Sequence, residues 1–435
     1  MVFSELMIIT FALLFILLVV GCPVGLTLLV VGAAGMWLAG GLDVMLAVLG
    51  SVPYNSVAAW GLVVVPMFVL MGEMMASANF QVDAFEAARR WVGRLPGGLA
   101  ISSVLVCAMM ACCCGSGMAT TATMGRVAIG EMERHGYKDY FAAGCIPLSG
   151  SLAVMIPPST MLVFYAMLTH QPIGPQLMAG ILPGILLIIL YVLTVLTWAK
   201  VNPSLAPAVT ERFTWGERFS SLGKMWPMFL VFFIIIGGIY SGIATAVEVS
   251  AIGGAATLLI WAARRNFSFS GISAPLKGTA SITASMFVIV LGAMVFSKFT
   301  SYIGLPFVMV DFIEGLNWPP LGVIFVIMGI YAVLGLFLEP LCMVMITIPF
   351  FFPIVEALGF NPLWFGILVT AQAELGVATP PIGLHLFVVA RVCPHISVEK
   401  IMRGVVPFVV VHSIGIVILV LFPKISLLIP MAMMK

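Results

Sequence analysis

The chain has 435 residues, of which 62% are hydrophobic and only 8% carry a charge, and its formal net charge is +2. Soluble domains have about 25% charged residues, so this composition excludes a soluble enzyme, a disordered chain and a nucleic-acid-binding protein. Most of the chain must therefore lie in membrane lipid. The eight cysteines lack the spacing of a metal site or of a disulfide framework, and we interpret them as small apolar side chains.

In the first half, apolar runs long enough to cross a membrane predict helices at residues 5–20, 24–38 and 62–76. An amphipathic stretch follows at 81–94, with Asp83, Glu86, Arg89 and Arg90 on its polar face. It is typical of a helix at the membrane surface, which either braces a moving domain or only anchors the chain. The half ends with an apolar block at 97–130 interrupted by glycines, a block at 140–168 interrupted by Pro157-Pro158, and a helix at 176–198.

A polar loop at 200–224 separates the two halves. The second half predicts helices at 225–240, 247–263 and 280–296, a mixed stretch at 298–318, an interrupted block at 319–358, a block at 362–391 broken at Pro380-Pro381, and a helix at 400–422. Interrupted blocks therefore occur in the same order in both halves.

The two halves also resemble each other in sequence. A shift of 223 residues places Pro157 and Pro158 on Pro380 and Pro381. We therefore predict two repeats, 1–200 and 225–435, joined by a cytoplasmic linker at 201–224. The first repeat has a re-entrant hairpin at about 97–133 and a helix broken at 157–158, and the second has a hairpin at about 319–358 and a helix broken at 380–381.

The lysines and arginines indicate how the repeats are oriented. A hairpin enters and leaves on one side, so each repeat crosses the membrane an odd number of times and the second is inverted. Basic residues favour the cytoplasmic side, and the inverted arrangement places all 19 there except Lys298, Lys424 and Lys435. The predicted fold class is an all-α polytopic membrane protein with two inverted-topology repeats, about 10–12 transmembrane helices and two re-entrant hairpins.

Inverted repeats with interrupted helices are typical of secondary transporters. In hydrocarbon, unwound backbone is tolerated only beside a cavity or an ion, and its free groups can then bind ligands. We therefore predict that the four breaks form the substrate and ion site. The alternatives are close helix packing through small residues for the first break and plain kinks for the prolines. The candidate residues are Gly115, Ser116, Gly117, Thr120, Pro157, Pro158, Ser159, Gly335, Glu339, Thr379, Pro380, Pro381 and Gly383.

Four glutamates lie in apolar surroundings, namely Glu73, Glu248, Glu339 and Glu374. Carboxylates inside a membrane are costly and indicate a function. Glu339 and Glu374 lie near the breaks of the second half, so we predict that they bind the coupling cation or hold the hairpin tip; the alternative is that they cap helix N-termini. His385 follows the second proline pair and either contacts substrate or only packs.

In order along the chain, these motifs resemble the large, DctM-type membrane subunit of tripartite ATP-independent periplasmic (TRAP) transporters. The resemblance runs from residue 21 to residue 422. It is strongest at 66–73 (PMFVLMGE), 93–99 (GRLPGGL), 115–125, 156–159 (IPPS), 179–184 (AGILPG) and 374–387. The chain departs from the family pattern at Cys114, Glu339 and Gln372, where serine, aspartate and asparagine are usual. It also has Thr245-Ala246-Val247-Glu248 where the family has Thr-Pro-Thr-Glu.

The resemblance implies an elevator transporter in the bacterial inner membrane that is not an enzyme. A periplasmic binding protein would deliver a small organic anion, and a small four-helix membrane subunit would complete the complex. A sodium gradient would drive transport, with no other cofactor and no nucleic acid involved. The family's pattern indicates sodium at backbone carbonyls near Gly115, Ser116, Gly335 and Thr379.

Two other functions stay open at this point. One is a stand-alone ion-coupled carboxylate or anion transporter that needs no binding protein. The other is an intramembrane enzyme, in which Ser116 would need a histidine or lysine partner. The sequence has no G-x-x-x-x-G-K-[ST] motif, so the chain does not itself hydrolyse ATP. Arg126 and Arg391 are the nearest basic candidates for holding an anion, unless both are cytoplasmic snorkelling residues.

Overall fold

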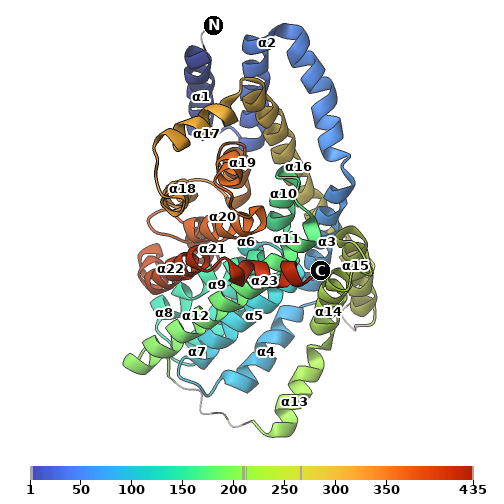
Figure 1. Cartoon of the computed structure of the whole chain (residues 1–435). Coiled ribbons are helices and arrows are strands. Elements are labelled where there is room, and N and C mark those ends of the chain that lie inside the picture. Colours follow the sequence, from blue (N-terminus) through green and yellow to red (C-terminus); the bar gives the residue numbers. More distant parts are fainter. Residues whose placement is uncertain (1–2, 208–210, 212, 265–266, 434–435) are drawn as a thin grey trace.

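In the computed structural model, every described element is a helix (Figure 1). The structure describes residues 3–207, 211, 213–264 and 267–433, without the side chains of 3–4 and 111–114. Within these ranges, six helices are long and apolar enough to cross a membrane, or eight if two bent pairs each form one span, and five shorter apolar helices have 10–17 residues. The all-α polytopic class is confirmed.

The first half follows the predicted order of helices and breaks. Its elements are α1 (Phe3–Val19), α2 (Val24–Val57), η1 (Trp60–Val63), α3 (Val64–Ser77), α4 (Phe80–Val92), α5 (Gly98–Cys114), α6 (Gly117–Met124), η2 (Gly125–Ile129), α7 (Gly130–Arg134), α8 (Asp139–Gly144), α9 (Ile146–Met155), α10 (Thr160–Leu168), α11 (Ile173–Ala179) and α12 (Ile181–Val201). α2 continues well past the predicted end at residue 38. Its two parts meet at Gly41, whose φ of 86° lies in the left-handed region that favours glycine.

The second half contains two helices that the sequence did not predict. Its elements are α13 (Trp215–Lys224), α14 (Trp226–Tyr240), α15 (Ala246–Ala262), η3 (Ser270–Ile272), α16 (Ser273–Tyr302), α17 (Leu305–Gly315), α18 (Pro320–Gly335), α19 (Pro340–Ala357), α20 (Pro362–Gly376), α21 (Leu384–Val392), α22 (Val398–Leu421) and α23 (Lys424–Met433). The expectation of a loop throughout 200–224 was wrong, because Thr214 and Glu217 form a capping box that starts α13. α23 follows the last predicted helix after a short break.

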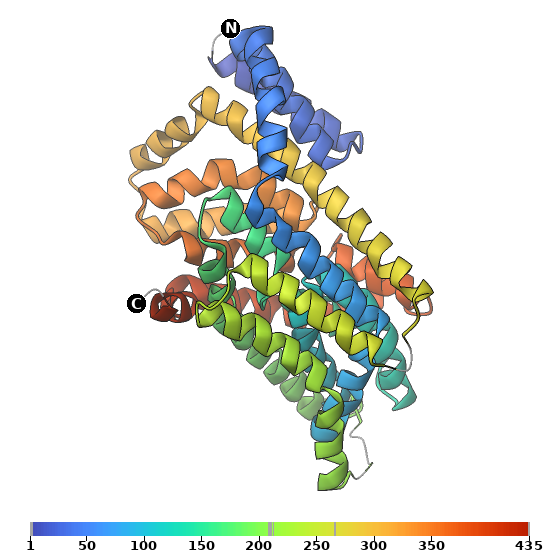
Figure 2. The ribbon, with the colours of Figure 1, turned by 90° about the vertical axis from the view of Figure 1, so that its right-hand side faces the viewer.

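The long helices α2 and α16 lie side by side (Figure 2). Glycines allow their backbones to approach closely. A β-carbon at Gly25 would lie 2.8 Å from the Ile289 Cα, and one at Gly32 would lie 2.8 Å from the Phe296 nitrogen. Small residues at such contacts are typical of helix pairs in membranes. With α3, which packs on α16, the pair forms one wall beside the broken helices.

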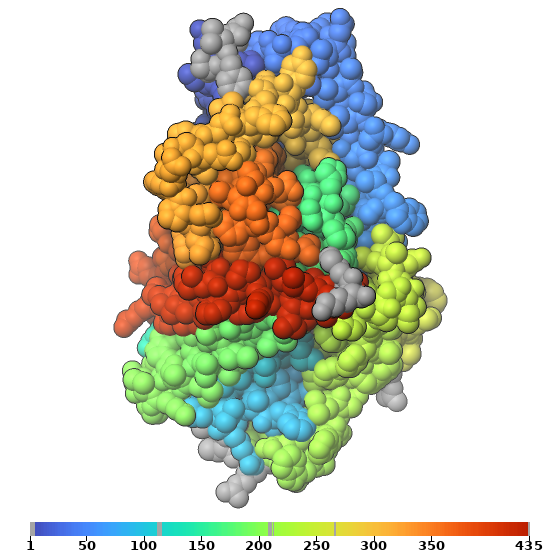
Figure 3. Space-filling model, viewed as in Figure 1, coloured from blue at the N-terminus to red at the C-terminus, as the bar shows by residue number. Residues whose placement is uncertain are grey.

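The broken helices of the two halves pack on each other. α9 contacts α5, α6 and α20, and α18 contacts α20. In the space-filling view the C-terminal helices α22 and α23 cross the middle of the face, between the orange segments of α17–α20 and the green α12 (Figure 3). This arrangement brings residues near 115, 158, 339 and 380 into one part of the molecule.

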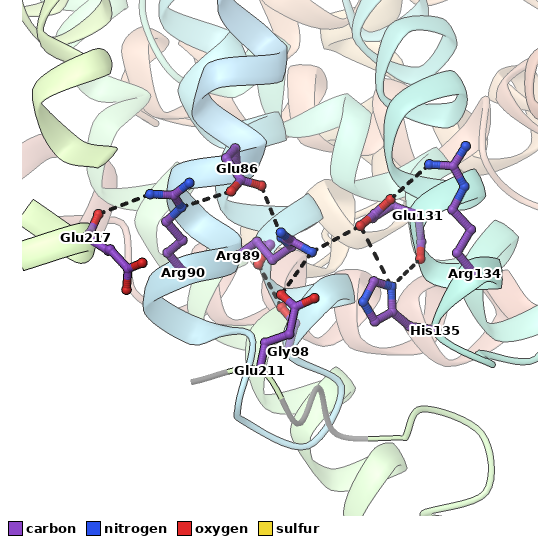
Figure 4. Close-up of polar contacts among 10 residues, drawn as sticks. Glu86, Arg89, Arg90, Gly98, Glu131, Arg134, His135, Glu211 and Glu217 are labelled. Atoms are coloured by element: carbon purple, nitrogen blue, oxygen red, sulfur yellow. Dashed lines mark hydrogen bonds and ion pairs between the residues drawn. The ribbon is translucent and has the colours of Figure 1, made fainter. Parts of the chain in front are cut away.

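One end of the molecule carries a network of ion pairs (Figure 4). Arg89 on α4 pairs with Glu86 at 3.1 Å, with Glu131 of α7 at 3.2 Å and with Glu211 of the linker at 3.4 Å. Trp91 donates a hydrogen bond to the Arg218 carbonyl of α13 at 3.1 Å. The amphipathic helix thus joins the linker to the first hairpin.

This end, with α4, α7 and α13, lies opposite the end that holds α1 and α17 (Figure 1). That the basic residues gather on the cytoplasmic face stays a prediction. Arg212, Arg265 and Lys435 lie outside the described residues.

Candidate functional site

The first hairpin turns between α5 and α6. Gly115 adopts a φ of 56°, and a β-carbon there would lie 2.9 Å from the Pro158 carbonyl oxygen, so only glycine fits this turn. The Ser116 hydroxyl accepts a hydrogen bond from the Ala119 N–H at 3.4 Å and caps α6. The side chain of Cys114 lies outside the described part of the chain.

The second hairpin turns between α18 and α19. Glu339 caps α19 by accepting a hydrogen bond from the Cys342 N–H at 3.2 Å, as one reading of the sequence allowed. Gly335 packs against α20, where a β-carbon would lie 2.8 Å from the Gly376 Cα. The hairpin tip therefore approaches the α20 backbone closely.

The first proline break is buried and tied to the first hairpin. Pro157, Pro158 and Ser159 are all buried, and the Ser159 hydroxyl accepts from the Leu162 N–H at 3.2 Å to cap α10. The Thr160 hydroxyl donates to the Gly115 carbonyl at 3.1 Å. This bond holds the α10 N-terminus against the hairpin turn.

The second proline break lies nearer the surface. Pro381 is exposed, and the Thr379 hydroxyl donates to the Leu375 carbonyl at 2.6 Å. The His385 N–H donates to the Val377 carbonyl at 2.9 Å and closes the break. The cavity described next is lined by none of the candidates of this break, Thr379, Pro380, Pro381 and Gly383. Of the other candidates, Thr120, Pro157, Pro158, Ser159 and Gly335 do not line it either.

A cavity of about 50 Å³ lies where the two hairpin tips meet α10 and α20. Each of its polar side chains has an atom that can accept a hydrogen bond; they are Ser116, Thr160, Glu339, Glu374 and His385. The structure therefore brings together Gly115, Ser116, Gly117, Glu339 and Glu374 of the predicted residues, with Thr160 and His385. A volume of this size holds a few water molecules or one small ion.

Glu374 is the most unusual side chain in this cavity. It is buried, and its Oε2 atom has no hydrogen-bond partner among the described residues. A β-carbon at Gly117 would lie 2.9 Å from this oxygen and 3.1 Å from the His385 Cε1. The His385 Nδ1 lies 3.2 Å from the Pro147 carbonyl, which favours a proton on Nδ1 and leaves Nε2 as an acceptor in the neutral ring. An unpaired buried carboxylate oxygen is costly unless a cation or a proton joins it.

Two buried threonines on α6 also have hydroxyls without partners in the described structure. They are Thr120, which the sequence predicted, and Thr121, which lies against Gly150 of α9. An unmade buried hydrogen bond costs about 1–3 kcal/mol. Neither threonine lines the 50 Å³ cavity, so the structure does not bring the predicted Thr120 into it.

A second cavity of about 260 Å³ shares Ser116, Thr160 and Met286 with the first. It extends along α6 to Arg126, and α3 contributes Glu73. Arg126 lies in the π-helical turn η2, is exposed, and donates a hydrogen bond to the Ala122 carbonyl at 3.4 Å. In the described part of the chain no carboxylate pairs with it. Arg391, the other basic candidate, is exposed on α21 and lines neither cavity.

Sequence reasoning missed the contribution of α16. Met286 lines both cavities, yet no charge, proline or glycine in its neighbourhood distinguishes it from other apolar residues. A histidine bonded to Ser116 would have supported an intramembrane enzyme, but the described hydrogen bond of Ser116 goes to the Ala119 N–H. Among the described residues, no group of three His, Cys, Asp or Glu side chains could hold a metal ion.

Comparison with known proteins adds the following. The family model for the DctM component of the tripartite ATP-independent periplasmic transporter matches residues 11–425. The C4-dicarboxylate TRAP large permease protein DctM of Pseudomonas aeruginosa is 32% identical over 85% of this chain and 86% of its own length. The ectoine TRAP large permease protein TeaC of Halomonas elongata is 32% identical over 84% of this chain and 85% of its own length. The crystal structure of the Alcanivorax borkumensis YdaH transporter superposes with a TM-score of 0.68 at 15% identity, covering 92% of this chain and 97% of that one.

Proposed function

Since the chain belongs to the family of DctM components of tripartite ATP-independent periplasmic transporters, we propose that it imports a small organic acid by coupling it to a sodium gradient. The chain is a multi-pass membrane protein, and the family implies a bacterial inner membrane. Two partners are implied as well: a small four-helix membrane subunit and a periplasmic binding protein that delivers the substrate.

The main support for sodium coupling is the cavity between the hairpin tips, which acidic side chains line. Glu339 and Glu374 both line it, and the Glu374 Oε2 has no partner among the described residues. Oxygen ligands from carboxylates, hydroxyls and unwound carbonyls suit a hard cation such as sodium. The Gly115 carbonyl already accepts from Thr160 and has a second lone pair free to bind an ion.

Arg126 supports an acidic substrate. Its guanidinium has no carboxylate partner in the described structure and lines a 260 Å³ cavity that shares Ser116 with the cation site. Arginine binds a carboxylate with two parallel hydrogen bonds. Glu73 lines the same cavity and disfavours a second negative charge nearby, so a monocarboxylate that carries hydroxyl or amine donors fits best.

The packing of the helices supports an elevator mechanism. The hairpins and broken helices contact one another, while α2, α3 and α16 form a separate wall beside them. We infer that the group containing both breaks and both hairpins slides along this wall with substrate and sodium bound. The two inverted repeats, 1–200 and 225–435, each supply one hairpin and one broken helix to the moving group.

The test is reconstitution of the chain with its small subunit and binding protein in proteoliposomes. We expect uptake of a labelled organic acid only with an inward sodium gradient, and only when all three components are present. Uptake driven equally well by a proton gradient would contradict sodium coupling. Full uptake without a binding protein would support a stand-alone transporter instead. Glu248→Gln is a matched control, because Glu248 is exposed and caps α15 away from the cavity.

A further inference from the structure

A third cavity, of about 630 Å³, lies between α2, α10, α16 and α19. It is more polar than the cavity around Glu374. Its polar lining consists of Ser51, Asn55, Ser56, His170, Ser297, Lys298 and Ser301. No carboxylate lines it, and the Lys298 ammonium has no ion pair or hydrogen bond in the described structure. The cavity therefore offers one free positive charge surrounded by hydroxyl and amide donors.

One face of α16 connects this cavity with the other two. Ile282 and Met286 line the cavity of Arg126, and Met286 also lines the cavity of Glu374. Val290, Met294 and Ser301 line the third cavity. Steps of four residues along a helix keep side chains on one face. The 19 residue steps from Ile282 to Ser301 rise about 28 Å, close to the thickness of the hydrocarbon core.

Helix α10 follows the same path from the other side. Thr160 at its start lines the cavity of Glu374, and Phe164, Met167 and His170 line the third cavity. The three cavities thus follow α16 in the order Arg126, Glu374, Lys298. Arg126 shares its cavity with Glu73, whereas Lys298 shares its cavity with no carboxylate among the described residues. Lys298 belongs to the C-terminal part of α16. This end of α16 leads into α17 and lies away from the basic helices α4 and α13 (Figure 1).

We propose that the cavity around Lys298 is the outer entry site of the path, where an organic anion binds before it reaches the acidic centre. The proposal rests on the proposed transport function. An anion released at the outer face meets carboxylates at Glu339 and Glu374, which repel it. The positive charge of Lys298 raises the local concentration of anions at that mouth. The donors of Asn55 and Ser301 can replace water around a carboxylate there.

The first experiment uses charged thiol reagents on right-side-out membrane vesicles that contain the whole complex. Ser301→Cys places a thiol one turn from Lys298 on the same helix face. The rate at which this thiol reacts is measured with two reagents, the anionic 2-sulfonatoethyl methanethiosulfonate and the cationic 2-(trimethylammonium)ethyl methanethiosulfonate. The rates for the unmodified chain, which keeps Ser301, are subtracted as background. Asn55→Cys on α2 repeats the measurement from another wall of the cavity.

The result expected is a preference for the anionic reagent that depends on Lys298. Lys298→Gln should lower the ratio of the two rates about threefold to eightfold, given one unit charge a few ångströms away in partly screened solvent. Lys424→Gln is the control, since Lys424 does not line the cavity. An equal ratio with and without Lys298 would overturn the proposal. So would the absence of any reaction at both thiols from the outer side.

The second experiment separates this proposal from the proposed function. In the reconstituted complex, Lys298→Gln should raise the KM for the transported anion about threefold to tenfold and leave the maximal rate nearly unchanged. An unchanged KM would overturn the entry site. Loss of sodium-dependent uptake in the unmodified chain would instead refute the proposed function, and the thiol measurement would still report whether Lys298 attracts anions.

Discussion

Gly117 offers a sharp test of the cation site, because a single methyl group there reaches into the cavity. The β-carbon of Gly117→Ala would lie 2.9 Å from the Glu374 Oε2. Ordinary van der Waals contact begins at 3.4 Å, so the carboxylate must move by at least 0.5 Å, the difference between the two distances. A binding site works when its ligands stay within about 0.5 Å of their positions. We therefore expect the apparent affinity for sodium to fall at least about tenfold.

The same substitution should leave the fold intact. Gly117 is the first residue of α6, and alanine is favoured over glycine in a helix by about 0.5–1 kcal/mol. The assay measures uptake in the reconstituted complex over a range of sodium concentrations, together with the thermal unfolding temperature. Gly130→Ala in the same hairpin segment is the control, since a β-carbon there meets nothing within 4 Å. Sodium dependence equal to that of the unmodified chain would refute the reasoning.

Three further changes test other parts of the structure. Glu374→Gln removes the unpaired buried charge, so thermal stability should stay the same or rise while sodium-dependent uptake falls more than about tenfold; uptake that keeps its sodium dependence would contradict a cation role. Arg126→Gln should raise the KM for an acidic substrate about tenfold to a hundredfold, with the sodium affinity unchanged, and kinetics at saturating sodium check this. Arg89→Gln breaks the ion pairs that join α4 to α7 and to the linker, and it should destabilise the protein by about 1–2 kcal/mol in thermal unfolding. The control is Arg134→Gln, which should have no measurable effect because the Arg134 side chain is 81% exposed.

The sequence predicted the helix breaks well because glycine and proline determine the local backbone. Gly115 must adopt a positive φ, and Pro157 and Pro158 cannot donate the hydrogen bonds of a continuous helix. Both features depend only on neighbouring residues. The capping box of Thr214 and Glu217 is just as local, so α13 was predictable from its motif even though its surroundings are polar.

Features that depend on tertiary packing could not be predicted in the same way. The two proline pairs are equivalent in sequence, yet Pro158 is buried beside the cavity and Pro381 is exposed. Met286 joins the site only because α16 packs against α2 and passes the hairpin tips. The sequence indicated Glu374 as a costly buried acid, but only the structure places it against Gly117 and His385.

Thermal unfolding of the purified protein in sodium and in potassium tests the central claim most directly, because it measures binding of the coupling ion without requiring transport. At constant ionic strength, replacing potassium by sodium at about 100 times the dissociation constant should stabilise the protein by about 2.7 kcal/mol. Glu374→Gln should abolish this difference, and Glu248→Gln should keep it. Equal unfolding temperatures in sodium and potassium for the unmodified chain would contradict a sodium site at the hairpin tips.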